Sequence, residues 1–143
     1  MVSRIKLAVT DDEIRSCYPV MSQLRSHLDE GRFCVQVRRQ MDTFGYKLPF
    51  LYDGGSVQAV GGIRISECLA WGKFLYVDDL VTNELSRSDG HGADLFNWIR
   101  DYASAKGCTQ LHLDSGVQRF GAHRFYLNHR MNIDCHHFSL VLK

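Results

Sequence analysis

Hydrophobic side chains near the start of the chain alternate briefly and then recur at helical spacing. Residues 5–9 alternate in the manner of a short strand. Thr10 and Glu13 follow at the spacing of a capping box, so we expect a helix to begin there. Pro19 falls within the periodic stretch and lacks the amide hydrogen that an uninterrupted helix needs. The pattern therefore predicts a first helix with a kink or a break near Tyr18.

The residues that follow indicate a second helix and then a change of period. This helix is expected from about Asp29, with Phe33 and Val37 on its apolar stripe and Gly45 as its terminating residue. From Tyr46 onward the apolar positions are spaced as in strands, and glycine-containing turns separate them, which is typical of an antiparallel meander. The three predicted strands cover residues 47–52, 56–67 and 73–82.

The second half of the chain returns to alternating helix and strand patterns. A long helix is expected over residues 90–106, stopped by Gly107. The segments after it are a strand at 109–114, a helix at 119–129 and a terminal strand at 133–142. The order β-α-α-β-β-β-α-β-α-β indicates an α+β fold, and the length favours a single domain that covers residues 1–143.

Composition and charge narrow the choice of partners. The chain has 45% hydrophobic and 23% charged residues, the balance of a globular protein. Its 17 basic and 16 acidic residues are interleaved, so neither nucleic acid nor a membrane surface is an expected partner. No signal peptide and no apolar run of about 20 residues is present in the sequence, and we expect a cytoplasmic protein.

Seven histidines and five cysteines raise the question of a metal site. The cysteines include no C-x-x-C pair, which fits reduced thiols. The histidines at 123, 129, 136 and 137 include no pair at i, i+4 on a helix. His136 and His137 are neighbours on a predicted strand, so their rings should point to opposite faces. We therefore expect no metal cofactor.

The loop before the long helix has the features of a diphosphate cradle. A helix start leaves backbone amides unpaired and carries a partial positive charge, so it can bind phosphate. Gly90 and Gly92 remove Cβ atoms that would hold a phosphate away, and Arg87 can add a charge-assisted hydrogen bond. The ordinary structural explanation is a simple turn into a helix. An ATP-binding P-loop is disfavoured because its lysine is missing, and a dinucleotide fingerprint because Leu95 replaces its third glycine.

Together with Thr82, the series Arg87-x-x-Gly90-x-Gly92-Ala93 resembles the acetyl-CoA pyrophosphate motif of the GNAT superfamily, R/Q-x-x-G-x-G/A. Two further segments resemble the fourth strand and the A-x-x-F-Y helix of that family: residues 76–82 and 122–126. The resemblance covers nearly the whole chain. It implies a mixed, largely antiparallel central sheet of six to seven strands flanked by about four helices, and acetyl-CoA as the co-substrate.

The resemblance also implies roles for particular residues. The fourth strand would carry a bulge whose free amides, at Leu80 or Val81, polarise the acetyl carbonyl and stabilise the oxyanion, while Thr82 pairs with the pantetheine arm. Tyr126 would protonate the departing thiolate. The implied cofactor-binding residues are Leu80, Val81, Thr82, Arg87, Ser88, Asp89, Gly90, His91, Gly92 and Ala93.

Two aspartates on the same strand are candidates for proton transfer. By strand periodicity Asp78 and Asp79 point to opposite faces, each in apolar company. An alkyl ammonium must lose a proton before its nitrogen can attack a thioester, and either carboxylate could accept it. The ordinary explanation for at least one of them is that it caps a turn or pairs with an arginine. Glu67 and Asp114 are weaker candidates for the same role.

These observations favour an N-acetyltransferase in which a primary amine attacks acetyl-CoA directly. A small-molecule acceptor is favoured over a protein tail, and an amino acid, a polyamine and an amine-bearing antibiotic all remain open. A protein N-terminus also remains open as an acceptor. The alternatives are a non-catalytic acyl-CoA sensor or partner-binding module and, more weakly, a nucleotide-binding protein. Oligomeric state is also open, with a homodimer among the alternatives.

Overall fold

A computed structural model describes residues 4–143, and the chain divides between His112 and Leu113 into two compact units. The elements of the first unit are β1 (Arg4–Leu7), α1 (Asp11–Leu24), α2 (Glu30–Phe44), β2 (Pro49–Asp53), β3 (Ser56–Cys68), β4 (Gly72–Thr82), the 3₁₀ helix η1 (Glu84–Asp89), α3 (His91–Ala105) and β5 (Gln110–Leu113), whose last residue opens the second unit. The second unit also contains α4 (Phe120–Asn128). The expectation of a single domain stays a prediction.

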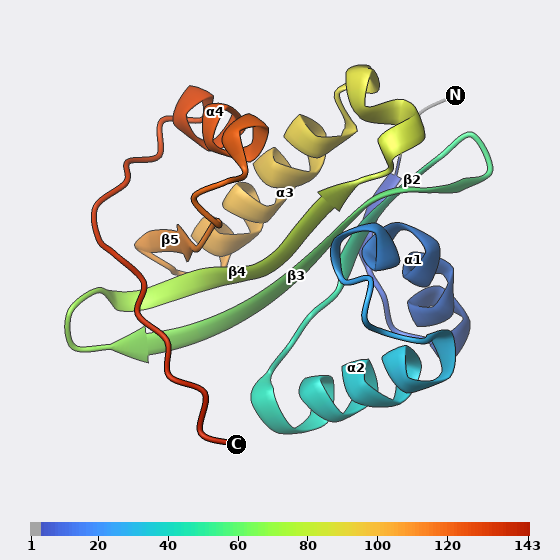
Figure 1. The fold of residues 1–143 in the computed structure, drawn as a ribbon, viewed down its shortest axis with the longest axis horizontal. Coiled ribbons are helices and arrows are strands. Elements are labelled where there is room, and N and C mark those ends of the chain that lie inside the picture. The colour runs from blue at the N-terminus through green and yellow to red at the C-terminus, as the bar shows by residue number, and fades with distance from the viewer. Residues whose placement is uncertain (1–3) are drawn as a thin grey trace. The chain divides into compact units, whose positions relative to one another are not determined.

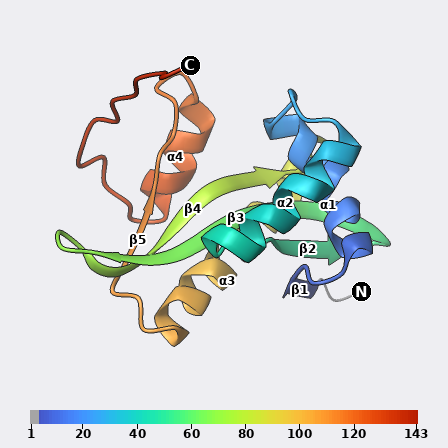
Figure 2. The same ribbon diagram turned by 90° about the horizontal axis from the view of Figure 1, so that it is seen from below.

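The strands form one five-stranded sheet in the order β1-β2-β3-β4-β5. The first four strands pair antiparallel with their neighbours in sequence, so the predicted meander is confirmed. Helices α1 and α2 lie on one face of this sheet and α3 lies on the other (Figure 1, Figure 2). The main apolar core fills the layer between the sheet and the first two helices, and it includes Ile14, Met21, Phe33 and Val60.

Helix α1 begins as the sequence predicts and continues where a break was expected. Thr10 accepts a hydrogen bond from the Glu13 amide at 3.1 Å, and Glu13 accepts one from the Thr10 amide at 3.1 Å, completing the capping box. Of the kink or break predicted near Tyr18, the break is wrong, because α1 runs through Pro19 without interruption. The kink stays a prediction. A proline in the interior of a helix costs about 3 kcal/mol. Four buried side chains of α1 pack into the core and offset this cost: Ile14, Cys17, Val20 and Met21.

Helix α2 follows its sequence signals closely. Asp29 caps its start by accepting a hydrogen bond from the Arg32 amide at 2.8 Å. Gly45 ends it in the left-handed region at φ 70°, which a glycine adopts without a Cβ penalty. The helix buries Phe33 and Val37 against the sheet. Tyr46, which directly follows Gly45, is thereby placed in the core.

The C-terminal residues differ from the sequence prediction. Residues 130–143 contain no helix or strand, so the predicted strand at 133–142 is wrong and the sheet has five strands instead of six to seven. The observed order therefore ends at α4. An alternating pattern favours a strand, but a strand forms only where its backbone can hydrogen-bond to a neighbouring strand. The α+β class and the four helices are confirmed. None of the helices within residues 4–143 is both long and apolar enough to cross a membrane.

Candidate active site

A bulge in β4 brings the two candidate aspartates to the same pocket. Gly62 pairs with Asp79 and Ile63 pairs with Val77, which leaves Asp78 as the extra residue on β4. An extra residue interrupts the alternation of side chains between the two faces of a strand. Asp78 and Asp79 consequently both line one pocket, and the prediction that they occupy opposite faces is wrong.

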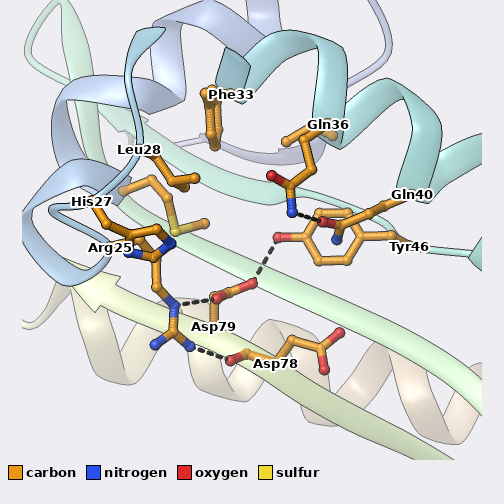
Figure 3. Close-up of a pocket in the computed structure, with 11 residues that line it drawn as sticks. Arg25, His27, Leu28, Phe33, Gln36, Gln40, Tyr46, Asp78 and Asp79 are labelled. Atoms are coloured by element: carbon orange, nitrogen blue, oxygen red, sulfur yellow. Dashed lines mark hydrogen bonds and ion pairs between the residues drawn. The ribbon is translucent and has the colours of Figure 1, made fainter. Parts of the chain in front are cut away.

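Asp79 lies between a cation and a phenol (Figure 3). Arg25 Nε donates to its Oδ1 at 2.9 Å, and the Tyr46 hydroxyl donates to its Oδ2 at 2.8 Å. Burial, followed by the Asp79 charge, raises the pKa of Tyr46 well above its usual value, so this phenol remains a hydrogen-bond donor. A Cβ at Gly62 would overlap both the Tyr46 hydroxyl and the Asp79 carboxylate. The glycine therefore leaves the space in which these two groups meet.

Asp78 is held by a different arginine. Arg64, on β3, donates from Nε and Nη2 to the two carboxylate oxygens of Asp78 at 2.6 and 2.7 Å. The backbone carbonyl of Asp78 also accepts a hydrogen bond from Arg25 Nη2 at 2.9 Å. Each aspartate is thus paired with an arginine, as the ordinary structural explanation expected for at least one of them. Arg25 contacts both aspartates, so its hydrogen bonds connect the segment after α1 with the β4 bulge.

The pocket encloses about 370 Å³ between the first two helices and β4, and all of its walls belong to the first unit. Arg25 and His27 lie at one end of it, whereas Gln40 and Tyr46 lie at the other (Figure 3). Gln36 Nε2 donates to Gln40 Oε1 at 2.9 Å, so the two amides form a pair along α2. Four apolar side chains complete the wall: Met21, Leu28, Phe33 and Val37.

The start of α3 has the backbone geometry expected of an anion cradle. Gly90 precedes the helix at φ 80°, and no side chain among residues 4–143 caps the helix start. The first intrahelical bond runs from the Asp94 amide to the Gly90 carbonyl at 3.1 Å, so the amides of residues 91–93 precede the regular ladder. Arg87 lies in the last turn of η1, directly before this glycine. The His91 ring is buried, and its Nε2 lies 3.0 Å from Asp53 Oδ2. The backbone amide of His91 is therefore the part of this residue that is suited to a phosphate.

The remaining candidate residues are placed as follows. Tyr126 lies in α4, and burial raises its pKa above the usual value although the Arg119 charge acts in the opposite direction. Asp114 lies 3.3 Å from His137 within the second unit. Glu67 lies near the end of β3, opposite Lys73, and is not part of the pocket wall. Neither Asp114 nor Glu67, the two weaker candidates for proton acceptor, lines the pocket.

Five pocket residues were missed by the sequence reasoning: Arg25, His27, Gln36, Gln40 and Tyr46. They belong to the first two helices and the segments that end them, far in sequence from Asp78 and Asp79. Arg25 and His27 lie just after the end of α1, whereas the apolar spacing predicted that the first helix continues to Leu28. Nothing in their spacing indicates that they meet β4.

Comparison with solved structures identifies the class of protein that this fold defines. The chain is similar to a transcriptional regulator from Bacillus halodurans C-125, with a TM-score of 0.83 and 17% identity over 99% of this chain and 100% of that one. It is also similar to glucosamine-6-phosphate N-acetyltransferase from Arabidopsis thaliana, with a TM-score of 0.79 and 17% identity over 100% of both chains. At these identities the likeness concerns the fold alone, which is one that acetyltransferases adopt.

Sequence comparison then establishes the family. The sequence model of the Acetyltransferase (GNAT) family matches residues 8–130. The uncharacterized N-acetyltransferase YhdJ of Bacillus subtilis (strain 168) is 33% identical over 122 residues, which cover 85% of this chain and 86% of that protein. The chain belongs to the GNAT family of acetyltransferases and is an N-acetyltransferase. The co-substrate of this family is acetyl-CoA, in agreement with the sequence prediction.

Proposed function

We propose that this enzyme transfers the acetyl group of acetyl-CoA to the primary amine of a small molecule by direct attack in a ternary complex. The observation that carries the proposal is the position of Asp79, a carboxylate in a pocket beside the β4 bulge. A cavity of about 370 Å³ is within the size range of small-molecule sites. An ammonium bound there lies next to a group that can accept its proton.

The start of α3 fits the diphosphate of acetyl-CoA. Gly90 leaves the approach free of a side chain, and the amides of residues 91–93 together with Arg87 supply donors. Ser88 and Asp89 complete the turn before the helix. When bound, acetyl-CoA supplies the thioester carbonyl that the amine attacks and the thiol that leaves.

Each remaining role belongs to a named group of the chain. Asp79 takes the proton from the ammonium, directly or through a water molecule, with Asp78 as the alternative acceptor. The amide of Leu80 or of Val81 stabilises the negative charge that develops on the carbonyl oxygen, and Thr82 backbone groups hold the pantetheine arm. As the C–N bond forms and the C–S bond breaks, the phenol of Tyr126 gives its proton to the sulfur. A phenol has an ordinary pKa of about 10, so it is protonated at neutral pH and has a proton to give.

Two measurements on the purified chain test this proposal. Calorimetry should show binding of acetyl-CoA and of CoA, with ATP binding far more weakly because the loop lacks the P-loop lysine. A panel of primary amines should then include compounds that release CoA thiol in an acceptor-dependent manner. Binding without acceptor-dependent release from any amine would favour the non-catalytic sensor. The ion pairs that already occupy both aspartates are the observation on which that second candidate rests.

A further inference from the structure

The pocket beside the β4 bulge contains charges of both signs in close pairs, and this arrangement bears on the class of acceptor. We propose that the acceptor is a small zwitterionic amine, with a primary amine and a carboxylate on the same or adjacent carbon atoms, as in an amino acid. The inference rests on the proposed acetyl transfer and specifies its substrate. A polyamine and a polycationic antibiotic are correspondingly disfavoured.

The first argument is the charge balance of the pocket. Arg25 lies 2.9 Å from Asp79, and Arg64 binds both oxygens of Asp78 at 2.6 and 2.7 Å. The two carboxylates are therefore matched by two guanidinium groups. A compound with several ammonium groups would meet no excess of negative charge here, and its desolvated charges would lack partners. A ligand with no net charge leaves the balance intact.

The second argument is the set of donors that remain. Arg25 uses Nε and Nη2 in its contacts with the two aspartates, and no bond to its Nη1 occurs among the described residues. The ring of His27 lies beside Arg25 and likewise makes no hydrogen bond within residues 4–143 (Figure 3). These two side chains can donate hydrogen bonds to an anion at the end of the pocket nearest Asp79. A guanidinium N–H is well suited to a carboxylate.

The third argument is the short distance between the cationic and anionic parts of the wall. Because Arg25 Nε contacts Asp79 Oδ1 directly, a ligand that uses both residues must present its ammonium and its anion only a few atoms apart. The charge pair of the ligand then lies antiparallel to the charge pair of the wall. An α- or β-amino acid has this spacing, whereas an amine with a distant anion does not.

The rest of the pocket suits a short side chain on the ligand. Leu28, Phe33 and Val37 provide an apolar wall beside the paired amides of Gln36 and Gln40. The volume of about 370 Å³ is large enough for an amino acid together with an aliphatic side chain. A branched aliphatic amino acid is therefore a reasonable first probe.

Three matched compounds isolate the contribution of the carboxylate: L-leucine, L-leucinamide and 3-methylbutylamine. They share the primary amine and the aliphatic chain, and only the first is zwitterionic. Acceptor-dependent thiol release should give kcat/KM at least about tenfold higher for L-leucine than for the other two, the size expected for one hydrogen bond to a charged group. Spermidine should be a poorer acceptor than L-leucine.

Two arginine variants separate ligand recognition from structural support. Arg25→Gln should reduce the ratio of kcat/KM for L-leucine over L-leucinamide toward one, because the donor for the carboxylate is lost. A purely structural role would lower both values together and leave their ratio unchanged. Arg32→Gln is the matched control, since within residues 4–143 Arg32 pairs only with exposed Asp29 and does not line this pocket. It removes the same charge nearby and should preserve the ratio.

The outcomes separate this inference from the proposed function. Turnover in which the amide or spermidine equals or exceeds L-leucine would overturn the zwitterion and leave acetyl transfer standing. Absence of turnover with these compounds and with every amine of the wider panel would overturn the proposed function. In that case calorimetry with CoA present decides the inference: tighter binding of L-leucine than of L-leucinamide supports it, and equal affinities overturn it.

Discussion

The two parts of the site are built in different ways. The cradle at the start of α3 consists of a glycine at φ 80°, neighbouring amides and one arginine within a few residues of sequence. The pocket at the β4 bulge instead joins Arg25, Tyr46 and Asp79, which are brought together only by the packing of α1 and α2 on the sheet. The cradle depends on backbone conformation, whereas the pocket depends on side chains held by long-range contacts. Substitutions should therefore affect cofactor binding and acceptor chemistry separately.

The largest effect is expected at the pocket carboxylate. Asp79→Asn keeps the size of the side chain and removes the proton acceptor, so kcat/KM for the acceptor should fall by about 10²- to 10³-fold. Asp78→Asn, on the neighbouring residue held by Arg64, should have a smaller effect. Steady-state thiol release measures both, and calorimetry should show unchanged acetyl-CoA affinity. Equal activity of Asp79→Asn and the parent enzyme would remove Asp79 from the mechanism.

A second prediction concerns Gly62, the glycine on β3 that pairs with Asp79. Gly62→Ala introduces a Cβ where the Tyr46 hydroxyl and Asp79 meet, so the carboxylate must move. A displacement of about 1 Å can cost about 10²-fold in rate, and we expect a loss of that order in kcat/KM with acetyl-CoA binding intact. Gly61→Ala is the control, because its Cβ would instead approach Ile99 and Pro49 at 3.1 and 3.3 Å. That variant should change thermal stability more than activity.

The third prediction concerns the cradle. Gly90→Ala places a Cβ on a residue at φ 80°, which costs about 1–2 kcal/mol and distorts the approach to the amides of α3. The KM for acetyl-CoA should rise about tenfold, in line with that cost, while kcat at saturating acetyl-CoA stays near its original value. Gly107→Ala imposes the same strain at φ 81° beyond the other end of α3. A similar rise in KM for both variants would show that strain, and not the cradle, is responsible.

The smallest effect is expected at the start of α1. The Lys6 ammonium, and then the amides of Thr10 and Val9, lower the pKa of Glu13 to about 2. Since the folded pKa is depressed, this stabilisation is complete above the ordinary glutamate pKa near ~4.3 and is lost as the pH falls through about 2. Glu13→Gln should lower the free energy of unfolding by about 1 kcal/mol at pH 7, with the difference vanishing at low pH.

Urea unfolding at a series of pH values measures that difference. Asp12→Asn is the control, because Asp12 is exposed in the same first turn and, in the part of the chain that the structure describes, pairs only with Arg15. Its effect should be smaller at every pH. Neither variant should change acetyl-CoA affinity or thiol release, since neither residue lies in the pocket wall or in the cradle. A constant difference between Glu13→Gln and the parent across the pH range would contradict this assignment.

The same division explains how much could be predicted from the sequence. The helices and the three-stranded meander have local periodicity and local stop signals, and they were predicted close to their observed bounds. The break near Tyr18 and the strand at 133–142 were wrong because each depends on a tertiary partner. Core packing carries α1 through Pro19, and the terminal segment has no ladder among the described residues. Local patterns contain neither piece of information.

For the candidate site, the cradle was predicted and the pocket was predicted only in part. The glycine spacing near Gly90 and the pair of aspartates on β4 are visible in the sequence. Their common face is not visible, because it requires a bulge that strand periodicity does not include. Arg25 and Tyr46 were missed since their partners lie more than thirty residues away. The predicted roles of Tyr126 and of the cradle residues remain predictions that the variants above can test.

A crystal structure of the enzyme with CoA and L-leucine would test the central claim most directly. We predict the diphosphate against the amides of residues 91–93, and the leucine nitrogen within hydrogen-bond reach, about 3 Å, of the Asp79 carboxylate. A diphosphate bound elsewhere, or an amine out of reach of both Asp78 and Asp79, would contradict the account.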